Sequence, residues 1–166
     1  MPEIIAIANQ KGGVGKTTTS VNLAAALHAT GKKTLLVDLD TQGNATTACG
    51  IDKSNLEVSV YDLFVGAATA DAALVHPEAN GFWVLPANKD LMAAEIQLLE
   101  FREREFQLKQ ILAGISSRFD YVLIDTPPSM NILTINALAA SDGVIIPVQC
   151  EYYALEGLTG LLETIN

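Results

Sequence analysis

The sequence predicts an α/β fold, a mostly parallel sheet with helices on both faces, and three observations support it. Short runs rich in Ile, Leu and Val alternate along the chain with longer segments whose apolar residues recur at helical spacing. Apolar residues make up 49% of the 166 residues and charged residues 17%, which allows a sizeable core. Neither a repeat nor a linker interrupts the pattern, so we expect residues 1–166 to form one domain.

The strands are expected where short apolar runs end in polar residues, prolines or glycine turns. They cover residues 3–9, 34–39, 82–85, 121–124 and 143–148. Pro86 ends the third run, and Pro127 follows the fourth run closely. Because proline cannot donate a ladder hydrogen bond, neither strand is expected to continue further.

The helices are expected where apolar residues recur at turn spacing. They cover residues 16–30, 60–64, 71–75, 90–100, 105–119, 130–140 and 154–165. Gly31, Gly66 and Pro77 supply stop signals after the first three. Residues 40–47 are polar and are expected to form a loop.

The charge balance and the cysteines exclude several classes of function. Ten Lys and Arg against 19 Asp and Glu give a net charge of −9, whereas proteins that bind nucleic acid mainly through phosphates are usually basic. DNA binding would therefore need a local basic patch or residues beyond this chain. No apolar run is long enough to span a bilayer, so no membrane partner is expected. Cys49 and Cys150 form neither a metal cluster nor a disulfide framework, and we expect a cytoplasmic protein.

Polar clusters follow three of the predicted strands, at residues 9–15, 38–44 and 125–129. In open parallel sheets, ligands bind outside the carboxyl ends of the strands. The three clusters are therefore expected to meet at one edge of the sheet and to form one site.

A glycine-rich loop between the first strand and the first helix has the composition of a phosphate-binding loop. It reads, in order, Lys11, Gly12, Gly13, Val14, Gly15, Lys16, Thr17 and Thr18. Glycines let backbone N–H groups approach phosphate oxygens, and the helix N-terminus adds its positive dipole end. Lys16 would bind the β- and γ-phosphates of ATP, the Thr17 hydroxyl would ligate Mg²⁺, and Thr18 would donate to the α-phosphate. Gln10 stands where the usual pattern has its first glycine, so a chance glycine turn before a helix is the alternative.

Three aspartates follow the strands of the expected site. Asp40 could position the water that attacks the γ-phosphate. Asp125 would face Mg²⁺, directly or through water. Asp38 lies two residues before Asp40 on the same strand face. It either helps to hold Mg²⁺ through water or is a strand-end carboxylate bonded to backbone N–H groups.

The loop of residues 11–18 resembles the deviant Walker A motif of the ParA/MinD ATPase superfamily, and the chain resembles its partition branch, ParA/Soj, over essentially all 166 residues. The landmarks are residues 11–18, 38–44, 85–88, 125–129 and 147–152. This resemblance implies a P-loop NTPase fold and an ATP-dependent homodimer that hydrolysis switches off, acting in chromosome or plasmid partition.

The resemblance also implies roles for single residues and for partners. Lys11 would reach the nucleotide of the partner protomer, as an arginine finger does, although it could instead contact only its own nucleotide. Asp40 would be the catalytic switch residue. The dimer would bind DNA nonspecifically at the nucleoid, and a ParB-like partner would trigger hydrolysis. Family domains continue past the position of Asn166, so we expect this chain to be truncated at its C-terminus.

Two other functions stay open at the level of the sequence. The chain could be a non-catalytic interaction module that keeps the phosphate loop but lacks a full nucleotide pocket. It could also be an ATP-dependent amidating synthase of the cobyrinic acid type, which would need a small-molecule acid as its substrate.

Overall fold

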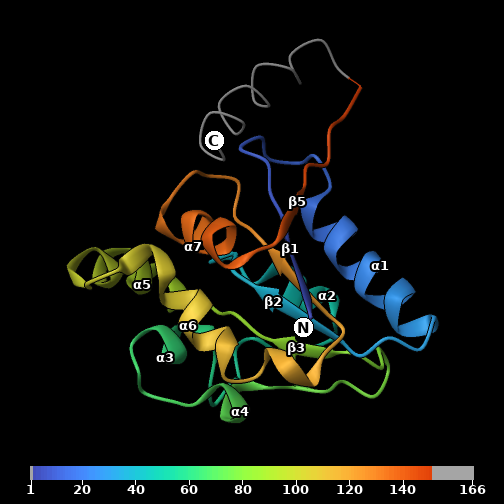
Figure 1. Cartoon of the computed structure of the whole chain (residues 1–166), viewed down its shortest axis with the longest axis horizontal. Helices are drawn as coiled ribbons and strands as arrows, with labels where there is room; N and C mark the ends of the chain where they lie inside the picture. Colours follow the sequence, from blue (N-terminus) through green and yellow to red (C-terminus); the bar gives the residue numbers. More distant parts are fainter. Residues whose placement is uncertain (1, 151–166) are drawn as a thin grey trace.

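Five parallel strands form the centre of the molecule in the order β3-β2-β4-β1-β5 (Figure 1). The computed structural model describes residues 2–150. The strands are β1 (Glu3–Ile7), β2 (Thr34–Asp38), β3 (Trp83–Leu85), β4 (Tyr121–Asp125) and β5 (Gly143–Ile145). One isolated antiparallel bridge joins Val75 to Val84 of β3. The predicted fold class is thereby confirmed.

Helices cover both faces of this sheet (Figure 1). They are α1 (Lys16–Ala29), α2 (Asn44–Ala48), α3 (Val60–Phe64), α4 (Ala70–Ala73), α5 (Leu91–Gln97), α6 (Gln107–Ala113) and α7 (Ile132–Ala140). Short 3-10 turns follow α5 and flank α6, at Leu98–Glu100, Arg104–Phe106 and Ser116–Arg118. No helix within residues 2–150 is both long and apolar enough to cross a membrane.

The inner strands are apolar on both faces because each face is covered by helices. Leu36 of β2 and Leu123 of β4 pack into the cluster that includes α1 and α2, whereas Leu35 and Val37 pack into the cluster that includes α3, α5, α6 and α7. Successive side chains of a strand point to opposite faces, so one short run supplies both clusters. Burying each such side chain contributes about 1.5–3 kcal/mol.

The strand register brings the chemically important strand ends together. Asp125 at the end of β4 pairs in register with Ile7 of β1 on one side and with Asp38 of β2 on the other. The loops that follow these three strands therefore leave the sheet side by side. This is the arrangement expected from the polar clusters in the sequence.

Several predicted elements are wrong in extent. Helix α2 begins inside the predicted loop at 40–47 and ends at Ala48, and Gly43 takes a left-handed conformation (φ 61°) at its N-terminus. The single helix predicted at 105–119 is instead one short helix between two 3-10 turns. The helix predicted at 71–75 ends early because Val75 pairs with Val84. The helix predicted at 154–165 lies outside the described residues.

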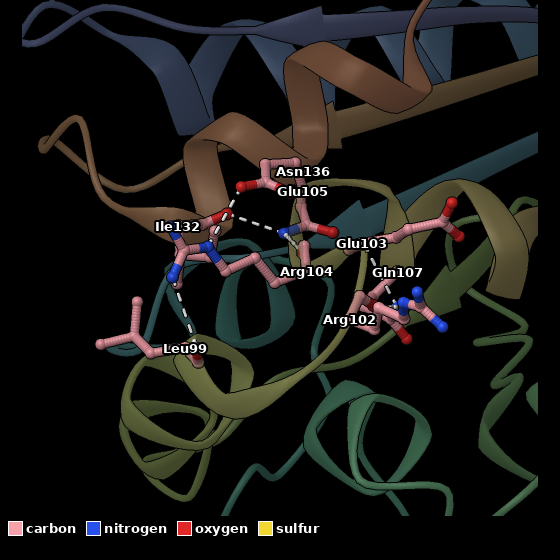
Figure 2. A network of polar contacts seen from close by, with 8 residues as sticks. All are labelled: Leu99, Arg102, Glu103, Arg104, Glu105, Gln107, Ile132 and Asn136. Carbon is pink, nitrogen blue, oxygen red and sulfur yellow. Dashed lines mark hydrogen bonds and ion pairs between the residues drawn. The ribbon is translucent and has the colours of Figure 1, made fainter.

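A buried amide fixes α7 against the segment that leads into α6 (Figure 2). Asn136 of α7 is fully buried and donates hydrogen bonds to the carbonyls of Arg104 (2.8 Å) and Ile132 (2.9 Å). Its side-chain oxygen accepts the N–H of Leu108 at 2.9 Å. Because α7 follows the loop at 125–129, these bonds also anchor one border of the site.

Candidate functional site

The three loops predicted to converge line one open pocket of about 340 Å³. The first loop and the start of α1 contribute most of its wall, the loop after β2 and the start of α2 contribute one residue each, and the loop after β4 contributes two more. The lining residues are Gly12, Gly13, Gly15, Lys16, Thr17, Thr18, Asp40, Asn44, Thr126 and Pro128. The pocket thus contains six of the eight residues of the predicted phosphate loop.

The phosphate loop turns sharply into α1 at Gly15, whose φ of 92° is strained for any residue with a Cβ. The N–H of Lys11 donates to Asn9 Oδ1 at 2.9 Å, which shapes the start of the loop. The carbonyl of Lys11 accepts a hydrogen bond from Lys16 Nζ at 3.0 Å. Val14, the remaining loop residue, is buried. The first N–H groups of a helix have no partner within the helix, which makes this loop suited to an anion.

Lys16 supplies a cation that is almost completely buried. Its side chain is only 7% exposed. Burial lowers the pKa of its ammonium group, and the carboxylates of Asp125 and Asp40 oppose that shift. A cation that lines the pocket at the N-terminus of α1 is well placed to bind a polyphosphate.

Asp125 is fully buried and is surrounded by hydroxyl groups. Thr17 Oγ1 donates to Asp125 Oδ2 at 2.8 Å, and Ser20 Oγ lies 2.8 Å from Asp125 Oδ1. Burial raises the pKa of Asp125 to about 6, although these two hydrogen bonds oppose the shift. A carboxylate beside a threonine hydroxyl is an oxygen donor set of the kind that Mg²⁺ prefers. These two residues therefore fit a magnesium ion bound to phosphate.

Asp40 lines the pocket with a carboxylate held at both oxygens. The N–H of Gln42 donates to Oδ1 at 3.0 Å, and Asn44 Nδ2 donates to Oδ2 at 2.7 Å. The side chain of Asp40 is 6% exposed. A fixed carboxylate in this position can accept a hydrogen bond from a water molecule near the end of the polyphosphate.

Asp38 is fully buried and is not among the residues that line the pocket. Its Oδ1 accepts the N–H of Asp40 at 3.0 Å, and its Oδ2 accepts the N–H (2.8 Å) and the hydroxyl (2.7 Å) of Thr46. Burial raises the pKa of Asp38 to about 7, against the effect of these hydrogen bonds. The contacts agree with the strand-end alternative drawn from the sequence, and a role in holding Mg²⁺ stays a prediction.

The segment after β5 also contacts the phosphate loop. Gln149 Nε2 donates to the carbonyl of Gly13 at 2.9 Å, and Asn9 Nδ2 donates to the carbonyl of Pro147 at 2.8 Å. Gln149 lies within the landmark at 147–152, but the sequence analysis gave it no role, and it did not single out Ser20. Ser20 could have been found because it lies three residues after Thr17, on the same side of α1. The contact of Gln149 with Gly13 could not be predicted, because it depends on the path of the chain after β5.

Comparison with known proteins agrees with this geometry. A family model described as an AAA domain matches residues 2–166. The sporulation initiation inhibitor protein Soj of Bacillus subtilis is 54% identical over 166 residues, which is 100% of this chain and 66% of the relative. The chromosome partitioning protein ParA of Myxococcus xanthus is 48% identical over 163 residues, covering 98% of this chain and 58% of the relative.

Solved structures extend the comparison. A crystal structure named cobyrinic acid a,c-diamide synthase, from Mycobacterium smegmatis with bound ATP analog and magnesium, has a TM-score of 0.96 and 47% identity, covering 99% of this chain and 67% of that chain. The chain therefore belongs to the family of P-loop ATPases described as AAA domains, in the branch of the Soj and ParA partition proteins. It spans 58–66% of the length of the Soj and ParA relatives named above.

Proposed function

We propose that the protein is an ATP-driven switch for chromosome or plasmid partition. The observation that carries the proposal is that the phosphate loop, Lys16 and Asp40 line one pocket, and that Asp125 accepts a hydrogen bond from Thr17 of the same lining. The names of the relatives support partition as the process. We expect the protein to work in the cytoplasm at the nucleoid.

The residues of the pocket have separate tasks in this proposal. The loop N–H groups and Lys16 bind the β- and γ-phosphates of ATP, and Thr18 donates to the α-phosphate. Thr17 and Asp125 hold Mg²⁺, which when bound neutralises charge on the phosphates. Asp40 orients a water molecule toward the γ-phosphorus and takes up its proton as the bond to the β-phosphate oxygen breaks, giving ADP and phosphate.

Lys11 acts across a homodimer interface in this proposal. Its backbone is fixed in the phosphate loop by hydrogen bonds with Asn9 and Lys16. A cation supplied by the partner protomer would stabilise the charge that develops during phosphoryl transfer. ATP binding would then favour the dimer, the dimer would bind DNA nonspecifically, and a ParB-like partner would trigger hydrolysis and reset the switch.

Size-exclusion chromatography with light scattering tests the switch. The full chain is measured with and without Mg-ATP, as wild type, Asp40→Ala and Lys16→Ala. We expect the mass to double with Mg-ATP in the wild type and to stay doubled longest in Asp40→Ala, because ATP is bound but not cleaved. Lys16→Ala should remain a monomer. A wild type that binds Mg-ATP and stays a monomer would contradict the proposal, and one that binds no Mg-ATP would favour a non-catalytic interaction module.

The structural similarity to the Mycobacterium smegmatis protein favours a second candidate, an ATP-dependent amidating synthase. Steady-state ATP hydrolysis separates the two candidates. A partition switch should hydrolyse ATP faster with DNA and a ParB-like partner and should not respond to cobyrinic acid with an amide donor. A synthase should show the opposite dependence.

A further inference from the structure

Thr46 of α2 connects two segments that border the site. It is fully buried, and its hydroxyl donates to Asp38 Oδ2 at 2.7 Å. The same hydroxyl oxygen accepts the N–H of Ala87 at 2.9 Å. Ala87 lies in the loop that follows β3, so one side chain joins the end of β2 to that loop.

Asp38 connects Thr46 to the backbone of Asp40, a residue that lines the pocket. Its second oxygen, Oδ1, accepts the N–H of Asp40 at 3.0 Å. The backbone of Asp40 is therefore held through a buried series of hydrogen bonds that begins at Ala87 and runs through Thr46 and Asp38. No atom of Thr46 lines the pocket, whereas Asp40 does.

A second contact joins the same two segments. The N–H of Gly43 donates to the carbonyl of Asp40 at 2.8 Å. A Cβ added to Gly43 would lie 2.7 Å from the carbonyl oxygen of Ala87. The loop after β3 thus touches the segment of Asp40 at two places, once through the hydroxyl of Thr46 and once through close backbone packing.

We propose that Thr46 is a positioning residue for hydrolysis, which fixes the carboxylate of Asp40 through Asp38 and ties its orientation to the loop after β3. This inference rests on the proposed function. Removing the hydroxyl would leave the Ala87 N–H without its acceptor and would take one of three donors from Asp38. The Asp40 segment could then shift, while the phosphate loop, Lys16 and Thr17 would be untouched.

The test compares Thr46→Val with Thr46→Ser in the full chain. Single-turnover hydrolysis of ATP and the affinity for Mg²⁺ with a nonhydrolysable ATP analogue are measured for each. We expect Thr46→Val to lower the hydrolysis rate about 10- to 100-fold, as misplacement of a reacting group does, with the affinity changed less than about threefold. Thr46→Ser keeps the hydroxyl and should restore most of the rate.

Thr34→Val is the matched control. Thr34 is also a buried threonine, at the opposite end of β2, and within residues 2–150 its hydroxyl makes only a 3.4 Å contact with the carbonyl of Lys32. We expect this variant to hydrolyse ATP at the wild-type rate. A rate for Thr46→Val that falls no further than that of Thr34→Val would overturn the inference. So would a loss of nucleotide affinity in proportion to the loss of rate, because it would indicate a general structural defect.

Amide hydrogen exchange tests the role of Thr46 independently of ATP hydrolysis. Without the hydroxyl, the N–H groups of Ala87 and Asp40 should exchange faster, and Thr46→Ser should protect both. Should Thr46→Val not fold, Thr46→Cys replaces it, because a thiol keeps the volume but donates only weakly. A wild type without ATP hydrolysis would refute the proposed function, and unchanged exchange at both amides would then separately refute the role of Thr46.

Discussion

The serine that contacts Asp125 from α1 provides a quantitative test of the magnesium site. Ser20 is fully buried, and its hydroxyl lies 2.8 Å from Asp125 Oδ1 and 2.9 Å from the carbonyl of Lys16. Replacing it by alanine removes a hydrogen bond that favours the ionised carboxylate. The net value of a hydrogen bond to a charged group is about 1.5–3 kcal/mol, so the lower end corresponds to a further rise in the pKa of Asp125 of about one pH unit.

The effect on binding of Mg-ATP should therefore depend on pH, since a ligating carboxylate must lose its proton first. In the wild type the pKa of Asp125 is about 6, so affinity should increase as the pH rises from 5 to 7. At pH 6, Ser20→Ala should reduce the ionised fraction of Asp125 from about a half to about a tenth, and affinity about fivefold. At pH 8 both proteins would be almost fully ionised, and the difference should nearly vanish.

Calorimetric titration with Mg-ATP at the two pH values is the assay, and Ser59→Ala is the control. Ser59 is also buried and donates to a carboxylate, at 3.1 Å to Asp62 Oδ2, but it lies outside the pocket. Both variants should lose about 1–2 kcal/mol of unfolding free energy, whereas only Ser20→Ala should change the pH profile of binding. An equal loss of affinity at pH 6 and pH 8, or none at pH 6, would refute the reasoning.

Three further predictions concern the loops of the site. Asp40→Ala should keep its affinity for Mg-ATP within about threefold while hydrolysis falls about 100-fold or more, and normal hydrolysis would exclude Asp40 as the residue that orients water. Gly43→Ala should lower the unfolding free energy, measured in urea, by about 1–3 kcal/mol more than Gly50→Ala does. Both glycines have a positive φ, but only the new Cβ at Gly43 would meet a backbone atom. Equal losses of unfolding free energy in the two variants would contradict the close packing at Gly43. Mixing inactive Lys11→Ala with inactive Asp40→Ala should restore about a quarter of the wild-type rate of ATP hydrolysis. Random pairing makes about half of the dimers mixed, and each mixed dimer has one complete site of two. No recovery of hydrolysis would argue against action of Lys11 across the dimer.

The sequence predicted the sheet and the place of the site because both depend on local pattern. Buried runs such as the one around Leu36 identify strands, and the order of strand, glycine loop and helix places Lys16 and Thr17. Parallel pairing then brings Asp40 and Asp125 to the same edge without further information. The roles of these residues stay predictions, although their positions agree with the roles.

The features that the sequence missed depend on contacts between distant segments. Nothing near Thr46 indicates that its hydroxyl meets both Asp38 and Ala87, which is 41 residues away. Helix α2 was predicted as loop because its residues, Asn44–Ala48, are small or polar and show no apolar spacing. The predicted helix at 105–119 looked continuous, yet Ser116–Arg118 forms a separate 3-10 turn after Gly114.

Calorimetric titration of the full chain with ATP, with and without Mg²⁺, tests most directly whether three strand ends build one site for a magnesium-bound polyphosphate. It compares the wild type with Asp125→Asn, which keeps the size of the side chain and removes its charge. We expect the wild type to bind one nucleotide per chain more tightly with Mg²⁺ and the variant to lose this enhancement. The same enhancement by Mg²⁺ in both proteins, or no binding by the wild type, would contradict the account.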